Sequence, residues 1–464
     1  MHFDHYLDDI LPEIIKSTQQ LVQIPSVKSD PLPNKPFGEG VNNALTYMLG
    51  LGQKMGFKTK NVDGYIGYIE FGTGKELVGI LAHLDVVPPG TGWTRLPFGG
   101  EIVDGKIYGR GSIDDKGPAV AALYAMKAVK DSGIKFDKRI RLILGLDEES
   151  NWQCIKHYKK VEEIPTVAFV PDARYPVIHA EKGILDYKFY QTVDNEQTPV
   201  KIICIQGGTR PNVVPDFCEA VIEINLQLMN SIYETLQHYI KNSKFNIELE
   251  QAENKIILKA YGKSSHASTP EKGVNAVSLL MTTLYNSLQS ININHAFITF
   301  YRHCIALENN GKSLGIAFSD HVSGELTFNV GLINVTPNQG EIIANIRYPV
   351  TFSAKEIYIN VYDTVKKYDI NVEELDHIPS KFLPKNHPLV QKLMAVYKEY
   401  TGDPIEPFAI GGGTYARAIE NAVAFGAVFP GQIKLAHEKD EYIEIDALIK
   451  NSKIFARAIY ELTK

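Results

Sequence analysis

Three adjacent acids follow an apolar segment of the sequence and raise the question of what chemistry they could perform. The segment 139–146, RIRLILGL, is typical of a buried strand and runs directly into Asp147, Glu148 and Glu149. An isolated acidic triplet most often marks a solvated loop. A functional site is indicated only if other strands end in residues of the same chemical type.

Other apolar segments do end next to imidazole or carboxylate side chains. These residues are His83 and Asp85 after 77–82, Asp114 and Asp115 before a helix predicted at 118–133, Asp172 after 166–170, and His437 after 423–429. Imidazole nitrogens and carboxylate oxygens are the ligands that zinc and similar divalent cations prefer. Because the carboxyl ends of parallel strands meet at one edge of a sheet, the set predicts a metal site there.

The spacing of His83 and Asp85 adds a detail to this prediction. Residues two apart in an extended segment share a face, so Asp85 can hold one imidazole nitrogen of His83 while the other nitrogen binds metal. The sequence contains neither a G-x-S-x-G motif nor a phosphate-binding loop of the G-x-x-x-x-G-K type. The chemistry that these residue types indicate is the binding of a divalent metal.

The elements that must position these residues predict two domains. Residues 1–183 alternate continuous apolar strands with helices, which indicates an α/β catalytic domain with a mostly parallel central sheet flanked by helices. Residues 184–380 contain strands of alternating polarity and helices near 273–290 and 354–368, typical of an inserted α+β domain with antiparallel sheets. Residues 381–464 return to the catalytic domain.

Composition narrows the class of protein. The 464 residues carry 48 basic and 54 acidic side chains without a basic block, which argues against nucleic acid as a partner. No apolar run is long enough to span a membrane, and the N-terminus has no signal-peptide pattern. Four scattered cysteines fit reduced thiols in a cytoplasmic protein.

In these motifs the chain resembles the co-catalytic metallopeptidases that include aminoacylase, acetylornithine deacetylase, succinyl-diaminopimelate desuccinylase and carboxypeptidase G. The resemblance covers essentially the whole chain and rests on HLDVVPPG, GRGSIDDKGP, DEES and PDA, in the family's order and at about its spacing. DDKGP and the long insertion are most similar to the bacterial PepV-type dipeptidase branch.

The resemblance implies two divalent metal ions per chain, with zinc favoured and manganese or cobalt as alternatives. His83 and Asp172 would hold one ion, Glu149 and His437 the other, and Asp114 would bridge them. Glu148 would be the general base, Asp85 would orient His83, and the peptide bond after Asp114 would be cis. Asp147 has no role in this account and is expected to be a solvated or capping acid.

The resemblance also implies that the inserted domain, residues 184–380, is a lid domain that closes over the substrate. His266 in SSHAS would stabilise the oxyanion of the tetrahedral intermediate. Asn212 in GGTRPNVVP and Arg347 in ANIRYPV would grip the free carboxylate of the substrate, and the loop AIGGGTYAR around Gly412 would offer backbone N–H groups near the same carboxylate.

The function predicted from the sequence is hydrolysis of dipeptides with a free N-terminus by a monomeric enzyme, with a small peptide as its only partner. The long insertion favours this reading, because it could supply His266 within one chain. One alternative is an N-acyl amino-acid deacylase or desuccinylase of the same family. A second is a non-catalytic binding protein that kept the fold, which the intact ligand set and Glu148 disfavour.

Overall fold

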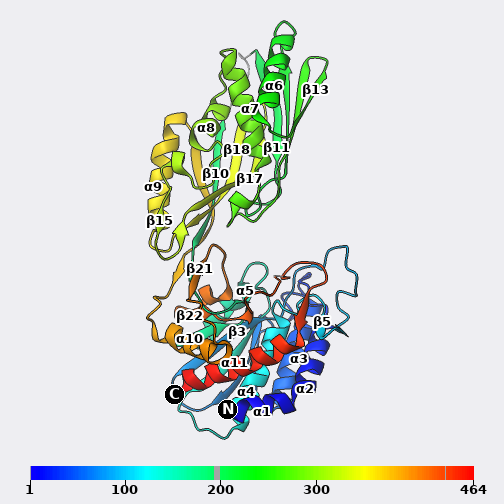
Figure 1. Cartoon of the computed structure of the whole chain (residues 1–464), viewed down its shortest axis with the longest axis vertical. Helices are drawn as coiled ribbons and strands as arrows, with labels where there is room; N and C mark the ends of the chain where they lie inside the picture. Colours follow the sequence, from blue (N-terminus) through cyan, green and yellow to red (C-terminus); the bar gives the residue numbers. More distant parts are fainter. Residues whose placement is uncertain (1, 193–198, 434) are drawn as a thin grey trace. The chain divides into compact units, whose positions relative to one another are not determined.

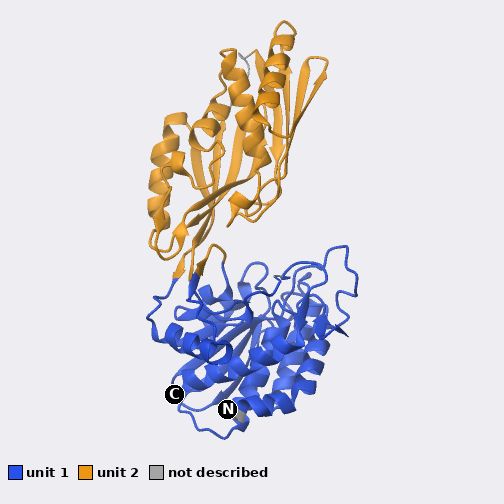
Figure 2. Cartoon of the chain, viewed as in Figure 1, with its two compact units in different colours: residues 1–179, 382–408, 413–464 blue, residues 180–381, 409–412 orange. Residues whose placement is uncertain are grey.

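The computed structural model describes residues 2–192, 199–433 and 435–464, and the chain divides into two compact units (Figure 2). Unit 1 comprises residues 1–179, 382–408 and 413–464, and unit 2 comprises residues 180–381 and 409–412. The sequence predicts boundaries at 183/184 and 380/381, and it assigns 409–412 to the catalytic domain. These four residues group with unit 2, where the backbone N–H of Lys182 donates to the Ile410 carbonyl (3.0 Å).

Unit 1 is built on a nine-stranded mixed sheet whose centre is parallel (Figure 1). Its strands are β1 (Lys58–Val62), β2 (Ile66–Gly72), β3 (Leu77–His83), β6 (Arg139–Gly145), β7 (Val167–Val170), β9 (Ile178–Glu181), β20 (Lys381–Phe382), β21 (Phe408–Ile410) and β22 (Ala422–Ala424). The order is β1-β2-β6-β3-β7-β22-β9-β20, with β21 paired to β9. The pairings β6–β3, β3–β7 and β7–β22 are parallel, as the continuous apolar segments predict.

Helices flank this sheet and complete the core of unit 1. They are α1 (His2–Asp9), α2 (Leu11–Val22), α3 (Glu39–Lys54), α4 (Lys116–Asp131), α5 (Gln153–Val161), α10 (Pro388–Thr401) and α11 (Ile445–Thr463). The alanine-rich helix α4 is buried along most of its length and packs against α11, α2 and strands β3 and β6. It begins directly after Asp114 and Asp115, so the core of unit 1 anchors the segment that carries these two acids.

Two small sheets of short strands complete unit 1. Their strands are β4 (Glu101–Val103), β5 (Lys106–Tyr108) and β24 (Tyr442–Glu444), which form one small antiparallel sheet, and β8 (Ala173–Arg174) and β23 (Ala427–Val428), which form a parallel pair. The β24–β5 pairing places Tyr442 opposite Tyr108 and so joins segments more than 300 residues apart.

Unit 2 contains an eight-stranded antiparallel sheet in the order β13-β14-β12-β11-β17-β18-β10-β19. The strands are β10 (Gly183–Thr192), β11 (Val200–Gly207), β12 (Phe217–Ile224), β13 (Ile247–Ala252), β14 (Lys255–Tyr261), β17 (Thr327–Val335), β18 (Gln339–Tyr348) and β19 (Asn371–Ile378), with a separate hairpin of β15 (Ser319–Asp320) and β16 (Gly324–Glu325). The helices are α6 (Met229–Ser243), α7 (Ala276–Ser290), α8 (Ala296–Cys304) and α9 (Ala354–Val365). A mixed α/β unit and a separate antiparallel unit confirm the predicted fold class.

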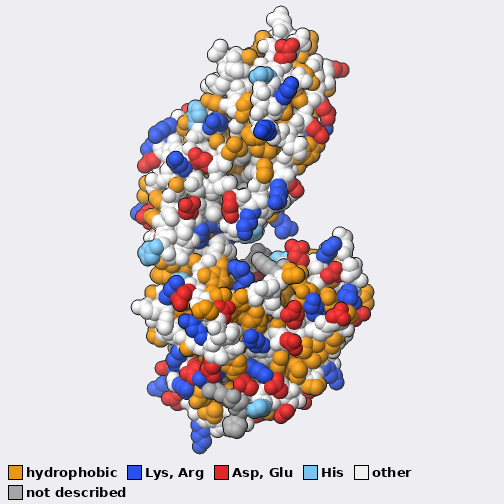
Figure 3. All heavy atoms as spheres, viewed as in Figure 1, with side chains coloured by type: hydrophobic (Ala, Val, Ile, Leu, Met, Phe, Trp, Pro, Cys, Tyr) orange, Lys and Arg blue, Asp and Glu red, His pale blue; other side chains and the backbone are white. Residues whose placement is uncertain are grey.

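The visible face of each unit is mixed in charge (Figure 3). On the faces visible in Figure 3, acidic and basic side chains are interspersed over each unit, consistent with the small net charge of −6. Among the described residues, no helix has both the length and the apolar character needed to cross a membrane.

Candidate metal centre and active site

The predicted ligands of unit 1 gather at the carboxyl ends of its parallel strands. His83 is the last residue of β3 and lies opposite Gly145, the last residue of β6. Glu148 and Glu149 follow β6, and Asp172 follows β7. The parallel register therefore delivers imidazole and carboxylate groups to one edge of the sheet, as the sequence pattern predicts.

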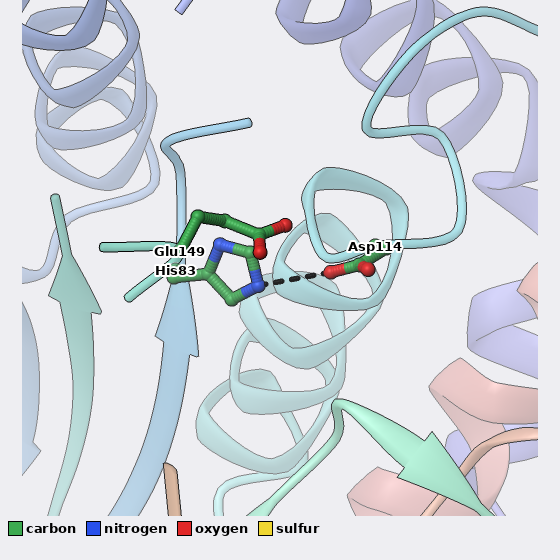
Figure 4. A group of neighbouring side chains, drawn as sticks. All are labelled: His83, Asp114 and Glu149. Carbon is green, nitrogen blue, oxygen red and sulfur yellow. Dashed lines mark hydrogen bonds and ion pairs between the residues drawn. The ribbon is translucent and has the colours of Figure 1, made fainter. Parts of the chain in front are cut away.

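Asp114 lies between two imidazoles and presents a different oxygen to each. Its Oδ1 is 3.0 Å from His83 Nε2, and its Oδ2 is 3.3 Å from His437 Nε2. Figure 4 shows the contact between His83 and Asp114, with Glu149 next to them. One carboxylate that serves two imidazoles in this way has the arrangement expected of a bridging ligand.

The remaining carboxylates lie on one or the other side of Asp114. Asp172 Oδ2 is 3.6 Å from His83 Nε2, and Glu149 Oε1 is 2.9 Å from His437 Nε2. Two groups each bring one donor atom per residue within 4.8 Å of the others: His83, Asp114 and Glu149, and His83, Glu148 and Asp172.

The spacing of these donors fits divalent cations. Four ligands about 2.0–2.1 Å from a tetrahedral ion lie about 3.3 Å from one another. The nitrogen–oxygen separations of 3.0 and 3.6 Å around His83, and of 2.9 and 3.3 Å around His437, scatter about this value. The donor set fits two cations that share Asp114, one beside Asp172 and the other beside Glu149.

The electrostatics of the cluster also favour bound cations. Burial disfavours protonation of His83, but the hydrogen bond to Asp114 and the charges of Asp85 and Asp172 outweigh it and raise the pKa of His83 well above its usual value. Burial raises the pKa of Asp172 well above normal, and the neighbouring carboxylate of Asp114 adds to this effect. Negative groups crowded together in this way are stabilised by positive charge.

Glu148 shows the same crowding. Burial raises its pKa to about 8, the charge of His83 opposes the rise, and the carboxylates of Glu149, Asp85 and Asp114 reinforce it. A carboxyl group with a pKa near the working pH is suited to accept and release a proton.

Asp85 contacts the site differently from the prediction. The Nδ1 atom of His83 lies 2.9 Å from the backbone carbonyl of Asp85, whereas the carboxylate oxygen Oδ1 is 3.6 Å away. The Asp85 carboxylate instead accepts the backbone N–H groups of Glu148 and Glu149, each at 3.1 Å. Asp85 therefore orients His83 through its backbone and the two glutamates through its side chain.

Of the two roles expected for Asp147, a solvated or a capping acid, the structure shows the capping role. Asp147 is fully buried and accepts a hydrogen bond from Lys28 Nζ (2.5 Å). Its second oxygen accepts the backbone N–H of Gln153 (2.9 Å) in the first turn of α5, which is the capping role that the sequence allowed. Asp147 thus fixes the far side of the loop that carries Glu148 and Glu149.

The segment around Asp114 has the backbone geometry that the family resemblance implies. The Asp114–Asp115 peptide bond is cis. Asp115 is fully buried, and its Oδ2 atom accepts the backbone N–H of His83 (3.2 Å). The loop before α4 is thereby connected to the end of β3.

Two buried charged residues near this cluster are missed by the sequence analysis. Arg110 and Glu441 form an ion pair of 2.7 Å between the loops that carry Asp114 and His437. A charged residue in a glycine-rich loop is usually solvated, so a single sequence offers no signal that pairs two residues this far apart.

Unit 2 brings together the residues predicted to bind substrate. The Nδ1 atom of His266 accepts the backbone N–H of Ser268 (3.2 Å) and lies 2.6 Å from the Ser268 hydroxyl. A neutral imidazole that accepts at Nδ1 carries its proton on Nε2. The backbone N–H of Ala267 donates to the Asn212 carbonyl (3.0 Å), so the segments of His266 and Asn212 are joined.

Arg347 is buried and held by polar partners within unit 2. Its Nε donates to Asn345 Oδ1 (2.7 Å), and its Nη1 donates to the Gly411 carbonyl (3.1 Å). A Cβ atom added at Gly411 would lie 2.9 Å from the Ser268 Cβ, so the glycine loop and the His266 segment are also neighbours. Arg347, Gly412, His266 and Asn212 thus lie in connected segments.

Comparison with known proteins gives a consistent result. Residues 79–461 match the model of Peptidase family M20/M25/M40. The chain is 43% identical over 459 residues to "Putative dipeptidase YtjP" of Bacillus subtilis and 37% identical to "Putative dipeptidase SH1171" of Staphylococcus haemolyticus, with 97% of both chains covered in each case. Among solved structures, aminoacylhistidine dipeptidase from Vibrio alginolyticus matches with a TM-score of 0.58 at 16% identity, covering 98% of this chain and 97% of that one. Human carnosine dipeptidase 1 matches with a TM-score of 0.57 at 15% identity, covering 99% and 98%.

Proposed function

The chain belongs to Peptidase family M20/M25/M40, and from this premise we propose that it hydrolyses dipeptides with a free N-terminus. The observation that carries the proposal is the position of Asp114 between His83 and His437, one oxygen toward each imidazole. The identity of 43% over nearly the whole of a protein named as a dipeptidase supports the substrate class.

In this proposal His83 and Asp172 hold one divalent cation, Glu149 and His437 hold the other, and Asp114 is shared. Such a pair of cations, when bound, polarises the scissile carbonyl and lowers the pKa of the attacking water. Zinc is the cation we favour, with manganese and cobalt as alternatives, because imidazole and carboxylate ligands suit all three.

Glu148 is proposed as the general base. Its carboxylate takes a proton from the attacking water and gives it to the amine nitrogen that leaves as the C–N bond breaks. The support is its position next to Glu149, the hydrogen bond of its backbone N–H to Asp85, and the proximity of its carboxylate to His83 and Asp172. Asp85 holds the glutamate pair in register with His83.

Unit 2 is proposed to bind the substrate and stabilise the oxyanion. His266 would donate from Nε2, the atom that carries the proton while Ser268 hydrogen-bonds to Nδ1. Arg347 would pair with the free carboxylate of the dipeptide, assisted by Asn212 and the backbone at Gly412. Support for Arg347 comes from its burial and from its two polar partners, which preorganise the guanidinium.

We also propose that the enzyme is a cytoplasmic monomer. Both edge strands of the unit 2 sheet carry exposed acids, Glu248 and Glu250 on β13 and Glu373, Glu374 and Asp376 on β19. Like charges along sheet edges disfavour edge-to-edge pairing of two copies. The four cysteines, all within the described residues, are free thiols, as is usual in the cytoplasm.

The test of the substrate class is a panel of dipeptides, each offered free and N-acetylated, with the apoprotein reloaded with Zn²⁺, Mn²⁺ or Co²⁺. A dipeptidase cleaves the free dipeptides, and N-acetylation abolishes cleavage. Dipeptide amides, which lack the carboxylate proposed to pair with Arg347, should be cleaved poorly. Faster turnover of N-acetyl or N-succinyl amino acids than of every dipeptide would replace the proposal with the deacylase alternative. Binding of cations without any hydrolysis would favour a non-catalytic binding protein.

A further inference from the structure

A buried ion pair joins the two loops that carry Asp114 and His437. Arg110 Nη1 lies 2.7 Å from Glu441 Oε2, and the exposed fractions of the two side chains are 2% and 0%. Burial of two charges is costly unless the pair is well hydrogen-bonded on all sides. The remaining partners of the pair therefore indicate what it holds in place.

The partners of Glu441 belong to the Asp114 loop. Its Oε1 atom accepts the backbone N–H of Ile113 (3.0 Å) and that of Asp114 (3.3 Å). The Glu441 carbonyl accepts the backbone N–H of Gly109 (2.8 Å). Glu441 thus fixes the backbone at the residue whose carboxylate lies between the two imidazoles.

Besides Glu441, Arg110 has two carbonyl partners in the His437 loop, and its Nη2 also reaches the Pro89 carbonyl (3.5 Å). Its Nη2 donates to the His437 carbonyl (3.2 Å), and its Nη1 donates to the Glu438 carbonyl (3.2 Å). His437 needs such support, because its side chain is 53% exposed and its backbone has a φ of 67°, unusual for a residue other than glycine. The planar guanidinium has N–H donors in fixed directions, which allows it to donate to Glu441 and to two carbonyls at the same time.

We infer that Arg110 and Glu441 are positioning residues that set the separation between Asp114 Oδ2 and His437 Nε2, and that they are required for the cation held by Asp114, Glu149 and His437. The other cation depends on them less, because His83 ends a central strand and is held by the Asp85 carbonyl and the Asp115 carboxylate. The inference rests on the proposed function only for the presence of two cations. Partners of ligands at this remove typically change metal affinity by about 10–100-fold.

The experiment compares Glu441→Gln and Arg110→Lys with the wild type. Glutamine keeps the size of Glu441 and an oxygen for the two N–H groups, whereas lysine keeps the charge of Arg110 without its planar fork. Glu70→Gln is the matched control, because Glu70 is largely buried and pairs with Arg141 (2.6 Å), and the other partners of Arg141 include Tyr158, Glu162 and the Glu163 carbonyl, none of which lies in a ligand-bearing loop. Each full-length apoprotein is titrated with Mn²⁺ and, separately, Zn²⁺ by calorimetry. Dipeptide hydrolysis is then measured against cation concentration, together with Tm.

We expect the wild type and Glu70→Gln each to bind two cations, and we expect the affinity for each cation to be the same in both proteins. In Glu441→Gln and Arg110→Lys one of the two cations should bind about 10–100-fold more weakly, the other should bind as in the wild type, and excess cation should restore activity. Wild-type affinity for both cations in the two variants would overturn the inference. So would equal weakening of both cations, or the same loss in Glu70→Gln, since either result would indicate general destabilisation. If one cation binds more weakly as expected but the wild type cleaves no dipeptide, the inference stands and the proposed function fails.

Discussion

Substitution of Glu148 by glutamine separates the chemical step from cation binding. Glutamine has nearly the size of glutamate, and the backbone N–H of residue 148 can still donate to Asp85. The amide cannot accept the proton of water at neutral pH. The substitution therefore removes the proposed base and leaves His83, Asp114, Asp172, Glu149 and His437 unchanged.

The expected loss is large and lies in kcat. A positioned general base typically contributes about 10²–10⁴-fold, which corresponds to about 2.7–5.4 kcal/mol in the activation barrier. KM for a good dipeptide should change little, because the residues proposed to bind the substrate carboxylate are in unit 2. Bound cations would lower the pKa of Glu148 from the value of about 8 that burial and its neighbours produce, and so keep the base ionised at neutral pH.

The assay measures kcat, KM and bound cations for Glu148→Gln beside Glu149→Gln. Glu148→Gln should retain two cations per chain and lose turnover, whereas Glu149→Gln should lose affinity for the cation near His437. The opposite pattern would show that the roles of the two glutamates are interchanged. Turnover of Glu148→Gln within about tenfold of the wild type would refute a general base at this position.

Two further predictions address stability and assembly. Burial of His295 at the start of α8 lowers its pKa to about 4. As the pH falls, the unfolded chain therefore protonates this histidine at a higher pH than the folded chain does. The free energy of unfolding of unit 2 should decrease by up to about 3 kcal/mol as the pH falls from about 6.5 to 4. Amide hydrogen exchange in α8 of the wild type should become faster as this stability is lost. The variant His295→Asn keeps a side chain that can cap the helix, and its exchange should depend less on pH. Equal pH dependence in the two proteins would contradict the role given to His295. A mixture of His266→Ala and Glu148→Ala chains should stay inactive if each chain works alone, and recovered dipeptide hydrolysis would show that the site is shared between subunits.

The gathering of imidazole and carboxylate side chains at strand ends could be predicted because a local rule governs it. An apolar strand that stops at an acid or a histidine is visible in the sequence, and the parallel register that gathers His83, Glu149 and Asp172 follows from the fold class. Which partner each side chain of the cluster contacts is not determined by the local sequence. The Asp85 side chain could face either the imidazole or the following loop, and only the packed structure shows that it accepts from Glu148 and Glu149.

Helix α3 shows why some elements could not be predicted. It contains Gly40, Gly50 and Gly52, residues that lower helix propensity. A Cβ at Gly40 would lie 2.1 Å from the Pro25 carbonyl, and one at Gly52 would lie 2.9 Å from Ile69. These two glycines are required by close packing against distant segments, so tertiary contact outweighs the local preference. The grouping of Ala409–Gly412 with unit 2 has a similar cause, because this segment has a backbone contact with Lys182 that the sequence does not reveal.

The residues proposed to supply chemistry can therefore be recognised in the sequence more easily than the residues that hold them in position. His437 can be identified by its type and by the strand before it, but its exposed side chain and left-handed backbone give no reason for it to stay near Asp114. That reason lies in Arg110 and Glu441, which contact the backbone of both loops rather than either side chain. Since backbone contacts leave no pattern in the partner's residue type, the geometry of this half of the site could be inferred only from the folded chain.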